Sequence, residues 1–319
     1  MYMKYLRLAL AAASLLLMVA LILNPSVYAQ SVTEGLLMYV VSVLPSMLPF
    51  FFLSGLLTGT GFAGKMSRVR LAKPLFHAPD VGLYVMLMSF LSGYPVGAKL
   101  TAEMYEKGVI DAQGAKKMLS FTSATGPMFV VGAVGTQILH SYRAGLCILA
   151  AHYLATFLNG LLYRGRKQKY GHCDNVTSLV QMDKLLWETA YNTVISLLVS
   201  CVYIVMFNMI ADVLNDIGVF GAIADGLSTL GVTTALGSAL VYGFTEMTRG
   251  CVMLAETALP LATTAPLCCL LVSFGGLGVC LQSTAYLTKC HVKPLYYLAT
   301  KTTQALMAFG LCRLFVLAL

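Results

Sequence analysis

Stretches of roughly 20 predominantly apolar residues, the length a helix needs to cross a bilayer, recur along the whole chain of 319 residues. Charged residues make up only 11% of the chain, whereas about 25% is usual in a soluble domain. The sequence therefore predicts an all-α polytopic (multi-pass) protein of the cell membrane, with the lipid bilayer as its surroundings. The apolar segments are residues 8–23, 36–57, 81–98, 118–138, 144–162, 190–210, 231–254, 267–286 and 296–316.

Composition argues against several other classes of protein. The net charge is +8, and in a membrane protein an excess of Lys and Arg reflects cytoplasmic loops, so we expect no nucleic acid partner. Most of the nine cysteines lie in apolar segments without a CxxC pair, which is typical of small buried side chains. We expect no metal site and no cofactor. No HExxH motif, supported Ser/Lys dyad or pair of intramembrane aspartates indicates an enzyme, and no nucleotide-binding loop is present.

The N-terminal region is similar to a secretory signal peptide. Lys4 and Arg7 precede the apolar run 8–23, and Val27-Tyr28-Ala29 is a candidate cleavage site. We expect a retained first transmembrane helix with a cytoplasmic N-terminus. Cleavage of this segment stays open as the alternative. In either case residues 24–35 are expected to form an outer loop.

The distribution of Lys and Arg predicts that two apolar segments do not cross the membrane. Regions 58–80, 99–117, 163–189 and 287–293 each contain two or more Lys or Arg residues, whereas 24–35, 211–230 and 255–266 contain neither. Because cytoplasmic loops carry the excess of Lys and Arg, a segment flanked by two regions of one kind enters and leaves on the same side. This holds for 81–98 and for 231–254. We therefore predict two re-entrant helical hairpins, 81–106 from the cytoplasm and 231–254 from outside, with irregular backbone shielded by protein or a wet cavity.

A constant spacing relates the two halves of the chain. Ser120-Phe121 and Ser273-Phe274 lie 153 residues apart (273 − 120), and the same offset carries segment 36–57 onto 189–210 and segment 144–162 onto 297–315. Because the charges give corresponding segments opposite orientations, the pattern indicates an inverted-topology repeat, as in many secondary transporters. The expected units are 1–35, the first repeat 36–162, a cytoplasmic linker 163–189 and the second repeat 190–319. Residues 62–77 and 215–230 are expected to form short interfacial helices.

Helix-breaking residues occur at corresponding places in the two halves. Gly and Pro interrupt segments 118–138 and 267–286 in addition to both hairpins, and paired breaks indicate a binding site near the membrane midplane. N-terminal ends of broken helices favour a carboxylate, and free carbonyl groups at the same breaks could bind a coupling cation. Thr245 offers a further hydroxyl. The candidate substrate-binding residues are Ser92, Gly93, Tyr94, Pro95, Gly97, Lys99, Ser123, Thr125, Gly126, Glu246, Thr248, Arg249, Ser273, Gly275, Gly276 and Gln282.

The charged candidates each have an alternative interpretation. Lys99 and Arg249 are suited to pair with ligand carboxylates, because charge inside a membrane is costly and usually functional. Lys99 could instead be an interfacial lysine that extends to the cytoplasm, and Arg249 could pair with Glu246 within the second hairpin. Lys301, about five residues into the last segment, could extend to the membrane surface in the same way.

Three stretches of the first half and two of the second resemble YlbJ-type sporulation integral membrane proteins, within the wider nucleoside-recognition (Gate) domain family. The stretches are SGYPVGAKLTAEMYEKG, LSFTSATGPMFVVGAVG, AHYLATFLNG, FTEMTRG and SFGGLGV. The resemblance covers about residues 35–315. It implies the fold of concentrative nucleoside transporters, with a transport domain that moves like an elevator inside a homo-oligomer, a trimer. It also implies a spore-forming host and movement of dipicolinate out of the mother-cell cytoplasm.

Residues and resemblance together favour a transporter for a small organic anion, with dipicolinate as the expected substrate. A nucleoside, another small solute or an ion is the alternative cargo within the same family. A different class is a non-transporting membrane scaffold needed for spore maturation. Direction, coupling ion and oligomeric state are not fixed by the sequence.

Overall fold

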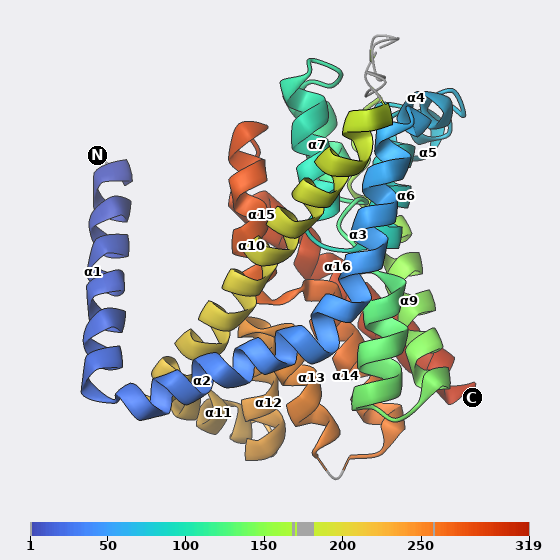
Figure 1. Ribbon diagram of the computed structural model, residues 1–319. Helices are drawn as coiled ribbons and strands as arrows, with labels where there is room; N and C mark the ends of the chain where they lie inside the picture. Colours follow the sequence, from blue (N-terminus) through green and yellow to red (C-terminus); the bar gives the residue numbers. More distant parts are fainter. Residues whose placement is uncertain (1, 168–169, 171–181, 258, 319) are drawn as a thin grey trace.

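The computed structural model describes residues 2–167, 170, 182–257 and 259–318 (Figure 1). Within these ranges every regular element is a helix, which confirms an all-helical protein. Four helical stretches are long and apolar enough to cross a membrane: Pro25–Gly59, Tyr142–Leu162, Lys184–Asp216 and Leu261–Lys289. Length and composition therefore agree with a polytopic membrane protein.

The first two helices meet at a sharp turn. Helix α1 (Tyr2–Leu23) ends before Asn24, and α2 (Pro25–Met38) begins with proline at its first position, where the missing N–H costs nothing. Helix α2 continues through the π-helical segment η1 (Tyr39–Val43) into α3 (Leu44–Gly59). The outer loop expected at residues 24–35 was therefore wrong: Asn24-Pro25 is only a turn, and the following polar residues are helical.

The first expected hairpin is a pair of short helices at one end of the molecule (Figure 1). Two small helices, α4 (Phe62–Ser67) and α5 (Ala72–Phe76), replace the single interfacial helix expected at 62–77. Helices α6 (Gly82–Ser92) and α7 (Val96–Glu106) then pack on each other. Gly93 separates them with a φ of +88°, a conformation that favours glycine. The helix break expected in this stretch is confirmed.

The rest of the first half contains the next expected break. Helix α8 (Ala112–Leu119) is followed by non-helical residues 120–126, by the π-helical segment η2 (Met128–Ile138) and by α9 (Tyr142–Leu162). Lys117 of α8 donates hydrogen bonds to the carbonyl oxygens of His77 (3.0 Å) and Arg166 (2.7 Å). Burial lowers the pKa of its ammonium group. Lys117 thus ties α8 to the chain on either side of it.

The second half contains seven helices within the described ranges. They are α10 (Met182–Asp216), α11 (Val219–Ser228), α12 (Thr234–Thr245), α13 (Met247–Ala255), α14 (Leu261–Phe274), α15 (Gly276–Lys289) and α16 (Pro294–Leu317). Glu246 separates α12 from α13, and Gly275 separates α14 from α15, so both expected breaks are confirmed. Helix α10 is longer than expected, because residues on both sides of segment 190–210 are also helical.

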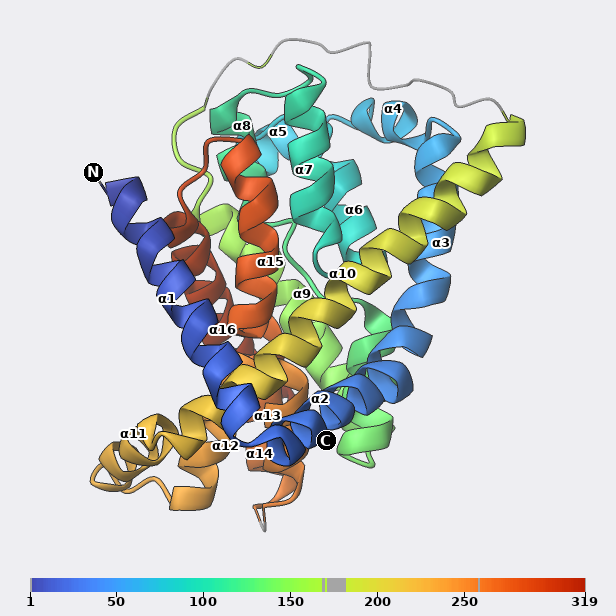
Figure 2. The same cartoon turned by 60° about the vertical axis from the view of Figure 1, so that its left-hand side comes forward.

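Helices from the two halves share one core. Helices α9, α14 and α16 pack together, and α10 runs diagonally across the molecule against α2 and α3 (Figure 2). Small side chains allow the close packing, including the fully buried Cys251, Cys268, Cys269 and Cys312. The interpretation of these cysteines as buried apolar residues is confirmed. Helices α6 and α7 lie towards one end of the molecule and α12 and α13 towards the other (Figure 1).

Candidate functional site

A small enclosed cavity lies where the breaks of the two halves meet. Tyr94 from the α6–α7 turn lines it on one side and Glu246 from the α12–α13 turn on another. We call this space the tip cavity. Its volume of ≈ 30 Å³ holds one or two water molecules. Five residues singled out from the sequence line it, namely Tyr94, Thr245, Glu246, Gly275 and Gln282.

The N-terminal end of α15 faces the tip cavity. Gly275 (φ +88°) ends α14 and precedes α15, and no side chain caps the first N–H groups of α15. Gly275, Gly278 and Val279 all line the cavity. Because uncapped N–H groups at a helix start attract negative charge, this wall of the cavity is electropositive. Gln282, one turn further, donates a hydrogen bond to the hydroxyl of Ser200 on α10 (3.1 Å).

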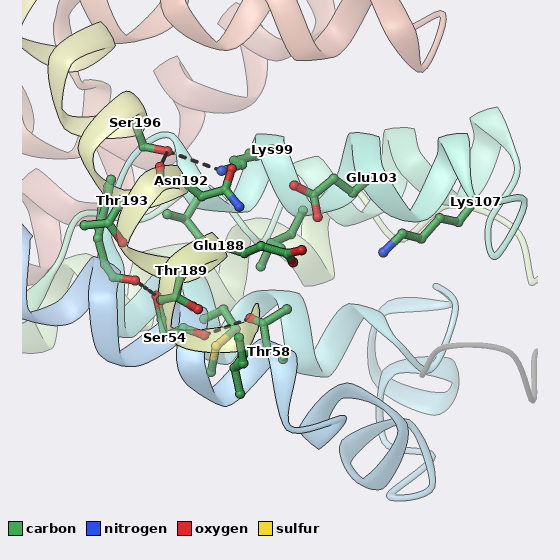
Figure 3. A pocket seen from close by; sticks show the side chains of 17 residues that line it. Ser54, Thr58, Lys99, Glu103, Lys107, Glu188, Thr189, Asn192, Thr193 and Ser196 are labelled. Atoms are coloured by element: carbon green, nitrogen blue, oxygen red, sulfur yellow. Dashed lines mark hydrogen bonds between the residues drawn. The ribbon is translucent and has the colours of Figure 1, made fainter. Parts of the chain in front are cut away.

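A larger open groove lies between α3, α7 and α10 (Figure 3). We call it the Lys99 groove, and its volume is ≈ 260 Å³. The ammonium group of Lys99 donates a hydrogen bond to the Ser196 hydroxyl (3.2 Å) across the groove. Glu103, Lys107 and Glu188 also line it. Lys99 therefore bridges to α10 instead of extending along α7 to the surface.

The groove and the tip cavity follow one another along the same two elements. On α10, Ser196 lines the groove and Ser200, one turn on, lines the tip cavity. On the first helix pair, Val96 lines the groove and Tyr94 lines the tip cavity. The open groove and the closed cavity are thus neighbours along these two elements, although they share no lining residue.

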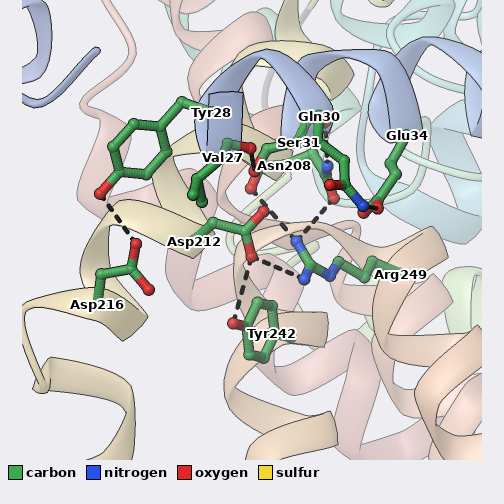
Figure 4. Close-up of polar contacts among 10 residues, drawn as sticks. All are labelled: Val27, Tyr28, Gln30, Ser31, Glu34, Asn208, Asp212, Asp216, Tyr242 and Arg249. Carbon is green, nitrogen blue, oxygen red and sulfur yellow. Dashed lines mark hydrogen bonds and ion pairs between the residues drawn. The ribbon is translucent and has the colours of Figure 1, made fainter. Parts of the chain in front are cut away.

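Glu246 and Arg249 do not form the ion pair considered as an alternative. The Glu246 carboxylate caps α13, accepting hydrogen bonds from the Thr248 hydroxyl (3.0 Å) and the Arg249 backbone N–H (2.7 Å). The guanidinium of Arg249 instead pairs with Asp212 of α10 at 2.7 Å (Figure 4). It also donates to the Asn208 side-chain oxygen (3.0 Å). Because Arg249 points to α10 and away from the tip cavity, the structure does not bring it to the other site candidates.

Lys301 is the charged residue that the sequence interpretation misplaced. It lies about two turns into α16 and is fully buried, so the expectation that it extends to the membrane surface was wrong. Its ammonium group donates hydrogen bonds to the Tyr94 hydroxyl, the Ser123 carbonyl oxygen (3.2 Å) and the Gln304 side-chain oxygen (2.8 Å). A buried Lys is drawn inward here because the breaks leave carbonyl and hydroxyl acceptors inside the core. Spacing alone does not reveal which face of α16 is buried.

His152 of α9 connects the break before η2 with the break after α14. Its Nε2 accepts a hydrogen bond from the Thr125 backbone N–H (3.0 Å), and its Nδ1 lies 2.7 Å from the Ser273 hydroxyl oxygen. Since a backbone N–H only donates, Nε2 carries no proton and Nδ1 does. The imidazole is thus neutral. His152 was missed because a single histidine in an apolar segment carries no pattern.

The remaining candidates have structural contacts. Ser123 donates from its hydroxyl to Tyr297 (3.1 Å), and the Ser92 hydroxyl contacts the Phe50 carbonyl oxygen at 3.5 Å. Close backbone approach explains the glycines, since a side chain on Gly97 would overlap the Thr122 carbonyl group. The other glycine and proline candidates, Gly93, Pro95, Gly126 and Gly276, lie at or beside the breaks. Within the described ranges, no three His, Cys, Asp or Glu side chains gather closely enough to hold a metal ion.

Comparison with known proteins finds a relative that matches nearly the whole chain. The sporulation integral membrane protein YlbJ of Bacillus subtilis (strain 168) is 28% identical over 329 residues, which cover 94% of this chain and 80% of the relative. The resemblance to YlbJ-type proteins is confirmed. The similarity to an integral membrane protein and the four apolar helical stretches together support a location in the membrane. No family model and no solved structure matches the chain, so its relation to the nucleoside-recognition domain family stays a prediction.

Proposed function

We propose that the protein is a membrane transporter or facilitator that acts in sporulation and moves a small organic anion, dipicolinate, out of the mother-cell cytoplasm. One observation carries the proposal: an open groove and a closed cavity at the breaks of both halves follow one another along α10 and the first helix pair. A cavity that is closed at the breaks, beside a groove that is open to solvent, fits one state of an alternating-access transporter. The similarity to a sporulation protein supplies the biological setting.

The positions of the helices support an inverted repeat with two re-entrant hairpins. Adding 153 to the bounds of α6 gives 235–245, and α12 spans Thr234–Thr245. Adding 153 to those of α9 gives 295–315, and α16 spans Pro294–Leu317. The α6–α7 and α12–α13 pairs lie towards opposite ends of the molecule (Figure 1). Together with the Lys and Arg distribution, this supports the proposal that the N-terminus and the Lys99 groove face the cytoplasm.

The chemistry of the cavity walls supports an anionic cargo with an apolar body. The uncapped start of α15 attracts negative charge, and Lys99 adds a cation in the groove. Met47, Phe129 and Ile204 offer apolar contact around the cavity. An aromatic carboxylate combines both properties. The proposal includes a coupling cation bound by backbone carbonyl groups at the breaks, and trimerisation rests on analogy with nucleoside transporters alone.

Flux through purified protein tests the proposal. Proteoliposomes that contain the protein should take up labelled dipicolinate faster than protein-free liposomes, and unlabelled dipicolinate should compete. Uptake of nucleosides without uptake of dipicolinate would favour the alternative cargo. The absence of any solute flux, with spores unaffected by substitutions that line the cavity, would favour the scaffold.

A further inference from the structure

Lys301 lies in the core without an acidic partner in the described part of the chain. Its side chain is fully buried. The acceptors that surround its ammonium group, on Tyr94, Ser123 and Gln304, are all neutral. The ion pairs of the described residues join Lys73 to Asp80, Arg249 to Asp212 and Lys289 to Glu106, none of them at Lys301. A buried cation without a counter-charge destabilises a protein unless an anion compensates it.

Tyr94 lies between this cation and the tip cavity. It lines the cavity, and the Lys301 ammonium group lies 4.4 Å from the centre of its ring and donates to its hydroxyl. Tyr94 stands at the turn between α6 and α7, directly after Gly93. A shift of this turn would therefore open the cavity to Lys301. Such a shift is also needed for volume, because the closed cavity admits only water.

Two of the three acceptors around Lys301 have other hydrogen-bond partners as well. The Ser123 carbonyl oxygen also accepts from the Gln304 amide (3.0 Å). The Tyr94 hydroxyl donates to the Ser273 carbonyl oxygen (3.2 Å). Since the Ser123 carbonyl oxygen keeps its bond from Gln304, little is lost there when Lys301 exchanges this neutral acceptor for a carboxylate.

We propose that Lys301 is the residue that pairs with a carboxylate of the cargo, reached when Tyr94 moves aside, and that it makes the site selective for anions over neutral molecules of the same shape. The inference rests on the proposed function and identifies the residue that makes its site selective for anions. Glu246 lies on another wall of the cavity with both oxygens engaged in capping α13. The anion is therefore oriented with its carboxylates towards Lys301 and the start of α15.

The test compares Lys301→Met with Lys293→Met in proteoliposomes. Lys293 is an exposed lysine at the start of the same helix. Uptake of dipicolinate at limiting concentration is measured beside uptake of its neutral diamide. We expect the wild-type protein and Lys293→Met to prefer the dianion. In Lys301→Met, uptake of dipicolinate should fall by about 10- to 100-fold, which is the effect of losing one charge-assisted hydrogen bond. This variant should also no longer prefer dipicolinate over the diamide.

Thermal stability separates this role from a structural one. Without ligand, Lys301→Met should be as stable as the wild-type protein or more so, because an uncompensated buried charge is removed. Dipicolinate should raise the melting temperature of the wild-type protein and of Lys293→Met only. A lowered melting temperature in Lys301→Met with unchanged selectivity would overturn the inference and leave the proposed function intact. If the wild-type protein itself takes up no organic anion, the proposed function fails and the inference with it.

Discussion

The Nδ1 atom of His152 lies 2.7 Å from the hydroxyl oxygen of Ser273, and this contact joins the two halves of the protein at their breaks. Thr125 donates to the opposite nitrogen of the ring from the first half. A single neutral imidazole thus holds two interrupted segments in register. The surrounding groups, from Tyr94 to Gln304, depend on that register for their own hydrogen bonds.

Replacing His152 by alanine should destabilise the protein. The change leaves the buried Thr125 N–H and Ser273 hydroxyl without their partner, at a cost of about 1–3 kcal/mol each. We expect the melting temperature in detergent to fall by at least ~5 °C. Leu154→Ala, on the outward face of the same helix, serves as the control. An unchanged melting temperature in His152→Ala would contradict the bridging role.

Arg249 and Asp212 should be energetically coupled. Their side chains are 21% and 16% exposed, and partly buried pairs of this kind couple by about 1–3 kcal/mol. A double-mutant cycle with Arg249→Met and Asp212→Asn, read as resistance to unfolding, measures the coupling. A parallel cycle between Arg249 and Glu246 side chains should give a smaller value. A larger coupling energy between Arg249 and Glu246 than between Arg249 and Asp212 would contradict this prediction and favour an ion pair between Glu246 and Arg249.

Substitution of Gly97 should disrupt the packing of the first helix pair. A methyl group there overlaps the Thr122 carbonyl group, whereas one on Gly310 of α16 meets no atom within 4 Å. Gly97→Ala should therefore lower both protein yield and melting temperature. Gly310→Ala should keep wild-type values or raise the melting temperature slightly, since alanine favours a helix over glycine. Equal behaviour of the two variants would show that α7 does not approach residue 122 so closely.

Lys99 should affect how readily the cargo enters, with less effect on its maximal flux. Lys99 lines the open groove and not the closed cavity, so it attracts an anion before the slow closing steps. We expect Lys99→Met to raise KM several-fold with maximal flux within about twofold, an effect that weakens at high salt. Lys65→Met, an exposed lysine of α4, is the matched control. A loss of maximal flux at unchanged KM would contradict this prediction and indicate that Lys99 acts in the conformational change.

The sequence predicted the breaks well, because Gly, Pro and isolated polar residues act locally. Gly93, Gly275 and Glu246 all separate helices where expected. The sequence did not predict that α2 begins at Pro25, because polar residues such as Gln30 and Glu34 are typical of a loop. Those residues lie on one turn of a helix and bond to each other.

Side-chain partners were less predictable, because they depend on packing between distant elements. The position of Lys301 near the start of its segment allowed it to reach the surface, although its face of α16 packs against the breaks of the other half. For Arg249 the sequence offered a ligand carboxylate or its neighbour Glu246 as partner, whereas its guanidinium pairs with Asp212 on α10. Spacing identified the elements of the candidate site, and only the packed fold identified which charges meet.

A structure of the protein determined with saturating dipicolinate would test the central claim most directly. The account predicts density for the anion in an enlarged tip cavity, with its carboxylates towards Lys301 and the N-terminal end of α15, and with Tyr94 displaced from its contact with Lys301. An anion bound only at the protein surface, or a tip cavity that stays closed around Tyr94 at saturating dipicolinate, would contradict it.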